Sequence, residues 1–117
     1  MSNEATIYHN PRCSKSRAAM ELLTEKGVET DVVKYLETPP DRTTLIDLLD
    51  MLGLNPRDLM RKGEAEYKDN NLADESLSDD DLLDALLKYP KLMERPIVVK
   101  NGQAAIGRPI ENIIDIL

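Results

Sequence analysis

The chain has 117 residues, of which 41% are hydrophobic and 32% are charged, and its 15 basic and 22 acidic side chains give a net charge of -7. This length fits one domain, and this composition is that of a folded globular protein rather than a disordered or fibrous one. The acidic balance argues against nucleic acid or an anionic membrane as a partner. The sequence has no signal-peptide pattern and no apolar stretch of ~20 residues, so we expect a cytoplasmic protein.

The first third of the chain predicts a β-loop-α-β unit. Residues 4–8 are typical of a short strand, and residues 9–12 interrupt it. Apolar residues then recur at helical spacing from Ser14 until Gly27, a common helix stop. Residues 32–35 predict a second strand. Because the crossover is short and helical, the two strands are expected to be parallel.

The middle of the chain predicts helices. An amphipathic helix begins at Asp41 or Thr43 and ends at Gly53, and Pro56 opens a second, short helix. The acidic run at residues 64–84 is expected to be a solvated face with helix caps, and Asn70-Asn71 within it marks a loop. Ser78 near its end is a helix cap followed by acidic residues, and it predicts a third helix.

The last third predicts a β-hairpin and a helix. Residues 95–100 and 103–106 are the strands, and Asn101-Gly102 between them is a strong signal for a tight turn. Residues 110–117 carry isoleucine and leucine at helical spacing, so this face is expected to belong to the core.

The predicted order, βαβ followed by helices and then ββα, indicates an α/β protein with a thioredoxin-like mixed sheet. A ferredoxin-like order, βαββαβ, fits less well. We expect a single domain over residues 1–117, with a helical insertion at approximately 41–93.

The cysteine and histidine content limits the chemistry. Cys13 is the only cysteine and His9 the only histidine. An intramolecular disulfide is therefore impossible, and a zinc site would lack nitrogen and sulfur ligands. We expect no metal site.

Cys13 lies where the loop after the first strand meets the first turn of a helix. Free backbone N–H groups and the positive end of the helix dipole favour an anion there. Arg12, Lys15 and Arg17 add three positive charges within residues 9–17, which contain no acidic residue. Each factor favours a lowered pKa of the thiol, and hence a reactive thiolate.

Two familiar uses of such a thiolate do not fit. A phosphatase loop of the Cys-x5-Arg type would need arginine at position 19, which is Ala19. A Cys-x-x-Cys redox pair would need cysteine at position 16, which is Ser16. What remains is a nucleophile that forms an adduct or mixed disulfide and depends on an external thiol to resolve it.

The motif His9-Asn10-Pro11-x-Cys13-x-x-Ser16-Arg17 resembles the active-site loop of the glutaredoxin-linked arsenate reductase (ArsC) family. Four later segments resemble family segments in the same order. They are residues 35–40, 59–62, 95–99 and 107–109. Within the family the chain is most similar to the short YfgD-like branch.

The resemblance implies that Cys13 attacks arsenate, that glutathione reduces the adduct to arsenite, and that glutaredoxin recycles the enzyme. It implies no tightly bound cofactor. It also implies an oxyanion clamp of Arg61, Arg95 and Arg108, and guanidinium groups suit that task because they bind tetrahedral oxyanions through two hydrogen bonds.

Further residues have supporting roles by the same resemblance. His9 would tune the thiolate, either by adding positive potential or by donating a hydrogen bond. Asn10 would hold the loop shape, and Ser16 and Arg17 would hydrogen-bond the thiolate or the anion. Pro96 matches the position of the cis proline that faces the catalytic thiol in thioredoxin-like folds.

Two other functions stay open. One is a glutathione-dependent thiol oxidoreductase that acts on another substrate. The other is an Spx-like regulator that binds RNA polymerase. Many Spx-type proteins use a Cys-x-x-Cys switch, which Ser16 removes here.

Overall fold

The computed structural model describes residues 4–117 and divides into two compact units. The first unit contains the residues up to Thr38 together with Arg95–Leu117, and the second contains Pro39–Glu94. The helical segment predicted at 41–93 falls within the second unit. Among residues 4–117, none of the helices combines the length and the apolar character needed to span a bilayer.

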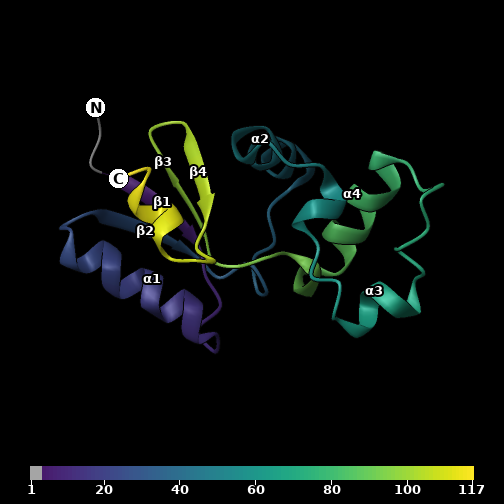
Figure 1. The fold of residues 1–117 in the computed structure, drawn as a ribbon, viewed down its shortest axis with the longest axis horizontal. Coiled ribbons are helices and arrows are strands. Elements are labelled where there is room, and N and C mark those ends of the chain that lie inside the picture. The colour runs from purple at the N-terminus through teal and green to yellow at the C-terminus, as the bar shows by residue number, and fades with distance from the viewer. Residues whose placement is uncertain (1–3) are drawn as a thin grey trace. The chain divides into compact units, whose positions relative to one another are not determined.

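The first unit contains a mixed four-stranded sheet in the order β2-β1-β3-β4 (Figure 1). Its strands are β1 (Glu4–Tyr8), β2 (Glu29–Val33), β3 (Ile97–Lys100) and β4 (Gln103–Ile106). β1 and β2 are parallel, whereas β1–β3 and β3–β4 are antiparallel. The predicted thioredoxin-like mixed sheet, the parallel first pair and the C-terminal hairpin are thus confirmed. Asn101 and Gly102 both have positive φ, 51° and 77°, as the expected tight turn requires.

β2 begins and ends earlier than the sequence predicts. The prediction placed it at 32–35, whereas it pairs from Glu29 to Val33. The reason is its register, because Glu29 lies opposite Glu4 and Val33 opposite Tyr8, so the partner strand sets both ends. Polar residues at the start of β2 hid this from the hydrophobic pattern.

The core of the first unit lies between the sheet and two helices, α1 (Ser14–Glu25) and α5 (Glu111–Ile114). Its fully buried members are Ala5, Ile7, Ala19, Leu23, Val98 and Ile113. The prediction that the whole apolar face of 110–117 is core was wrong in part. α5 has only four residues, and Ile114 and Leu117 are 46% and 36% exposed.

The second unit is helical. Its elements are α2 (Arg42–Leu52), the 3-10 helix η1 (Pro56–Leu59), α3 (Ala65–Asp69), α4 (Asp79–Lys88) and the 3-10 helix η2 (Pro90–Leu92). The sequence predicted that α2 begins at Asp41 or Thr43. Asp41 is the observed cap, because its carboxylate accepts the Thr44 N–H at 2.8 Å. The five-residue α3 was not predicted within the polar stretch, since it lacks a side-chain cap and buries only Tyr67.

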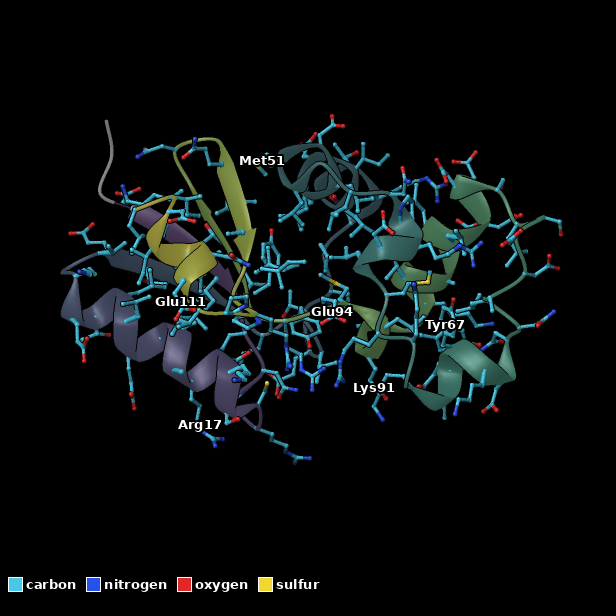
Figure 2. All side chains as sticks on the ribbon, viewed as in Figure 1. Arg17, Met51, Tyr67, Lys91, Glu94 and Glu111 are labelled. Carbon is cyan, nitrogen blue, oxygen red and sulfur yellow. The ribbon has the colours of Figure 1, made fainter. Side chains whose placement is uncertain are left out.

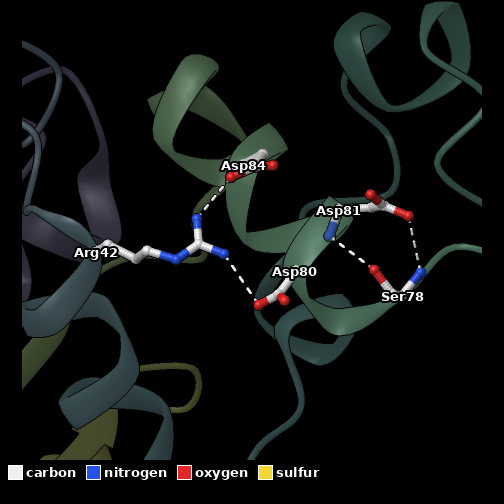
Figure 3. A network of polar contacts seen from close by, with 5 residues as sticks. All are labelled: Arg42, Ser78, Asp80, Asp81 and Asp84. Carbon is white, nitrogen blue, oxygen red and sulfur yellow. Dashed lines mark hydrogen bonds and ion pairs between the residues drawn. The ribbon is translucent and has the colours of Figure 1, made fainter.

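Charged side chains connect α2 to α4 (Figure 3). Arg42 forms ion pairs with Asp80 at 3.0 Å and with Asp84 at 2.6 Å. At the start of α4, Ser78 accepts the Asp81 N–H while the Asp81 carboxylate accepts the Ser78 N–H. Acidic residues of the run 64–84 therefore have two structural roles. Asp81 caps α4, and Asp80 and Asp84 pair with Arg42 of α2.

Gly107 offers a test of the packing beside the loop that follows β4. A Cβ atom at this position would lie 2.6 Å from Cδ1 of Ile113 and 2.9 Å from Cγ of Pro96. We predict that Gly107→Ala lowers the free energy of unfolding by about 1–3 kcal/mol through overpacking. Urea denaturation measures this change. Gly63→Ala is the matched control, because nothing lies within 4 Å of its Cβ position, and a comparable loss there would refute the packing explanation.

Candidate active site

Asn10 shapes the loop that carries the cysteine. Its carbonyl accepts the Cys13 N–H at 2.9 Å, which closes a β-turn, and its side-chain oxygen accepts the Arg12 N–H at 3.0 Å. Its own N–H donates to Oγ of the fully buried Ser16 at 3.3 Å. These hydrogen bonds of Asn10 and Ser16 hold the residues of the loop to one another.

Cys13 is the residue that caps the N-terminus of α1, and it is only 8% exposed. Burial raises the pKa of the thiol, but the N–H groups of Ser16 and Lys15 and the charge and N–H groups of Arg95 outweigh this effect. Together they lower the pKa of Cys13 from 9.0 to about 7. Sγ accepts no capping hydrogen bond of normal geometry, so the two amides act on it as nearby dipoles. Near pH 7 about half of the thiol is thus thiolate, against about one per cent at the ordinary pKa.

Two arginines approach the sulfur from the other end of the chain. Nη2 of Arg108 donates to Sγ of Cys13 at 3.5 Å, and Nε of Arg108 donates to the Arg95 carbonyl at 2.7 Å. Each arginine precedes a proline in a cis peptide bond, Arg95–Pro96 and Arg108–Pro109. The structure therefore brings together Cys13, Arg95, Arg108 and the cis Pro96 segment within the first unit.

The nearest cations in sequence are not those that lower the thiol pKa. The side chains of Arg12, Lys15 and Arg17 are exposed, and only the backbone N–H of Lys15 contributes. Arg17 lies on α1 (Figure 2), and its Nη1 donates to the carbonyl of Pro11 at 3.0 Å. Arg17 thus ties the loop to the helix. Likewise, Oγ of Ser16 accepts the N–H of Asn10.

His9 lies at the end of β1, and its N–H donates to the Val33 carbonyl at 2.8 Å. Burial lowers the pKa of His9, and the positive charges of Lys34 and Arg17 lower it further. The imidazole is therefore mainly neutral near pH 7. Of the two tuning roles expected for His9, this direction of the pKa favours the hydrogen bond over added positive potential, and both roles stay predictions.

Arg61 belongs to the second unit. Its N–H donates to the Leu92 carbonyl at 2.6 Å, and its guanidinium forms an ion pair with Glu64. Both side chains of this pair are partly buried, at 29% and 27% exposure. The i,i+3 spacing of Arg61 and Glu64 is a signal that sequence reasoning overlooked.

Within residues 4–117, no group of three or more histidine, cysteine, aspartate or glutamate side chains is arranged to hold a metal ion. The chemistry that the described residues offer is therefore that of one thiolate beside two guanidinium groups.

The fold and this geometry define the class: a thioredoxin-like α/β protein with a single reactive thiol at the start of its first helix. The model of the ArsC family matches residues 8–116. The chain accordingly belongs to the ArsC family.

Similar proteins cover the whole chain. The uncharacterized protein YfgD of Escherichia coli K12 is 58% identical over 100% of this chain and 99% of its own length. An arsenate reductase of Neisseria meningitidis serogroup A is 52% identical over 97% of this chain and 98% of its own length. The structure of an arsenate reductase from Vibrio cholerae is 51% identical, covers 100% of both chains and superposes with a TM-score of 0.96.

The thiol pKa gives a direct test of the site. We predict that the rate of Cys13 alkylation by iodoacetamide rises with pH and levels off above a midpoint near 7, because only the thiolate reacts. Arg95→Gln should move the midpoint to higher pH, since it removes a charge that stabilises the thiolate. Arg12→Gln, an exposed change one residue from Cys13, should leave the midpoint in place. Equal midpoint shifts in both variants would contradict the assignment of Arg95.

Proposed function

We propose that this protein is an arsenate reductase that uses Cys13 as its nucleophile and external thiols as reductants. Membership of the ArsC family and the similarity to proteins named arsenate reductase support an oxyanion-reducing oxidoreductase. The observation that carries the proposal is the Cys13 thiol, with a pKa of about 7, in contact with Arg108 and under the charge of Arg95. Such a group is a nucleophile that is about half ionised near pH 7 and lies beside donors for an anion.

The proposed reaction begins when the Cys13 thiolate attacks arsenic(V) and a sulfur–arsenic bond forms. One arsenate hydroxyl group is displaced, takes a proton from solvent and leaves as water. Glutathione thiolate then attacks the sulfur of the adduct. The electron pair of the sulfur–arsenic bond passes to arsenic, which leaves as arsenite. The two thiols have together lost two electrons and form a mixed disulfide between Cys13 and glutathione. Since the chain has no second cysteine, the mixed disulfide must be opened by an external thiol, for which we propose glutaredoxin.

Arsenate near neutral pH is an anion, so a thiolate approaching it is repelled unless both charges are compensated. In the proposal, Arg95 and Arg108 supply this compensation, which is worth most in the transition state, where the two negative groups are closest. Arg61 enters as the third arginine of the clamp through the family resemblance. A cytoplasmic location is part of the same proposal, because glutathione keeps thiols reduced in that compartment.

The proposal is tested by a coupled assay with arsenate, glutathione and glutaredoxin. We predict that Cys13→Ser abolishes turnover and that alanine at Arg95 or Arg108 lowers kcat/KM for arsenate by about 10- to 100-fold, the effect of losing a charged hydrogen bond worth 1.5–3 kcal/mol. The same loss at Arg61→Ala would support its place in the clamp. Lys26→Ala serves as an exposed control at the end of α1, outside the site.

The outcomes separate the alternatives. Full arsenate turnover in the Cys13→Ser variant would rule out every function that depends on this thiol. Arsenate turnover that survives the combined replacement of Arg61, Arg95 and Arg108 would refute their proposed role in binding the oxyanion. Glutathionylation of Cys13 with no arsenate turnover would favour a thiol oxidoreductase of another substrate.

A further inference from the structure

A cavity of about 260 Å³ lies on one flank of the cysteine loop, within the first unit. Residues 9–12 form one wall, and Lys34, Leu36 and Glu37 form the other. The sheet register explains this meeting of two loops. Tyr8 and Val33 are opposite each other where β1 and β2 end, so the segments that follow the two strands leave the sheet side by side.

The cavity is within reach of the nucleophile. The hydrogen bond from Cys13 N–H to the Asn10 carbonyl, 2.9 Å long, closes a turn whose ends are less than about 7 Å apart. An extended tripeptide is about 10 Å long. A ligand of that size held against residues 9–12 is therefore longer than the separation between the backbone of Asn10, which lines the cavity, and that of Cys13.

The charges around the cavity are mixed. Arg12 and Lys34 are cationic, Glu37 is anionic, and all three side chains are exposed. Among residues 4–117 none of the three takes part in an ion pair, whereas Arg42 and Arg61 do. Leu36, 41% exposed, and Pro11 add apolar surface between the charges. Two cations, one carboxylate and an apolar middle are complementary to a zwitterionic peptide that has more carboxylates than ammonium groups.

His9 adds a second indication of a ligand. The residue lines the cavity and is only 8% exposed, yet its Nδ1 atom is buried with no hydrogen-bond partner among the described residues. Leaving such an atom unpaired costs on the order of 1–3 kcal/mol. Because this atom is buried, a ligand in the cavity would offer the missing partner only once the imidazole turns toward it.

We propose that this cavity binds glutathione as the external thiol substrate. Lys34 and Arg12 would attract its two carboxylates and Glu37 its ammonium group, while its sulfur approaches Cys13. The inference rests on the proposed function in one respect, namely that the second thiol comes from outside the chain. It concerns a surface separate from Arg95 and Arg108, which do not line this cavity.

The test uses thiol–disulfide exchange without arsenate. The Cys13 thiolate attacks one sulfur of glutathione disulfide, a Cys13–glutathione disulfide forms, and a glutathione thiolate leaves with the electron pair of the broken bond. The initial rate of this adduct is measured by mass spectrometry. It is divided by the rate with uncharged hydroxyethyl disulfide, which reports the reactivity of Cys13 and the integrity of the fold. The ratio isolates recognition of the glutathione part.

Two variants distinguish a binding site from long-range electrostatic attraction, because one makes the cavity more negative and the other makes it less negative. Lys34→Glu should lower the ratio about two- to five-fold, the effect expected for an exposed ion pair. Glu37→Gln removes a negative charge and by long-range attraction alone would raise the ratio for the anionic glutathione disulfide. In a site that holds the ammonium group, it should instead lower the ratio about two-fold or more.

Matched controls lie at the end of α1. Lys26→Glu and Glu25→Gln make the same charge changes at exposed positions outside the cavity, so their ratios should stay near that of the unaltered protein. A raised or unchanged ratio in Glu37→Gln would overturn the proposal, and so would a Lys26→Glu effect equal to that of Lys34→Glu. Because no arsenate is present, a failure of the arsenate reductase proposal leaves this comparison interpretable.

Discussion

The candidate active site depends on the stabilisation of one buried negative charge, the thiolate of Cys13. Removing the Cys13 sulfur from water opposes ionisation, and three groups reverse this effect: the amides of Lys15 and Ser16 and the side chain of Arg95. The amides are available because α1 begins at this residue, so its first N–H groups have no partner within the helix. The arginine is available only because the sheet brings a distant loop to the same place.

The sheet register accounts for that meeting. Tyr8 at the end of β1 lies opposite Ile97 at the start of β3, and Ile97 lies opposite Ile106 at the end of β4. The loop after β1, the segment before β3 and the loop after β4 therefore leave the same end of the sheet. In this way Arg108 reaches a sulfur atom 95 residues earlier in the chain. The tight turn at Asn101-Gly102 fixes the register of β3 and β4, on which this placement depends.

Local signals were sufficient for the sheet, the hairpin and the place of Cys13 at a helix start. The pattern also gave the correct direction for the thiol pKa but the wrong cations, since Arg12, Lys15 and Arg17 are close in sequence yet exposed. Long-range pairing decides which charge is close to sulfur, and spacing along the chain does not contain that information. The same limit explains the shifted ends of β2 and the missed wall at Lys34–Glu37, because both follow from the partner strand.

In the proposed reaction a single thiolate meets two different anions, and this is an electrostatic difficulty in a chain of net charge -7. The strands β3 and β4 bring Arg95 and Arg108 to the sulfur. The mixed charges of Lys34 and Glu37, after β2, instead line a cavity with residues 9–12. An oxyanion and a thiol peptide differ in the charge pattern that they need, since only the peptide carries an ammonium group. With the oxyanion at Arg95 and Arg108 and the peptide in the cavity, each proposed substrate would bind to its own set of charges. The loop itself, held by Asn10 and Ser16, is the rigid element that both approaches require.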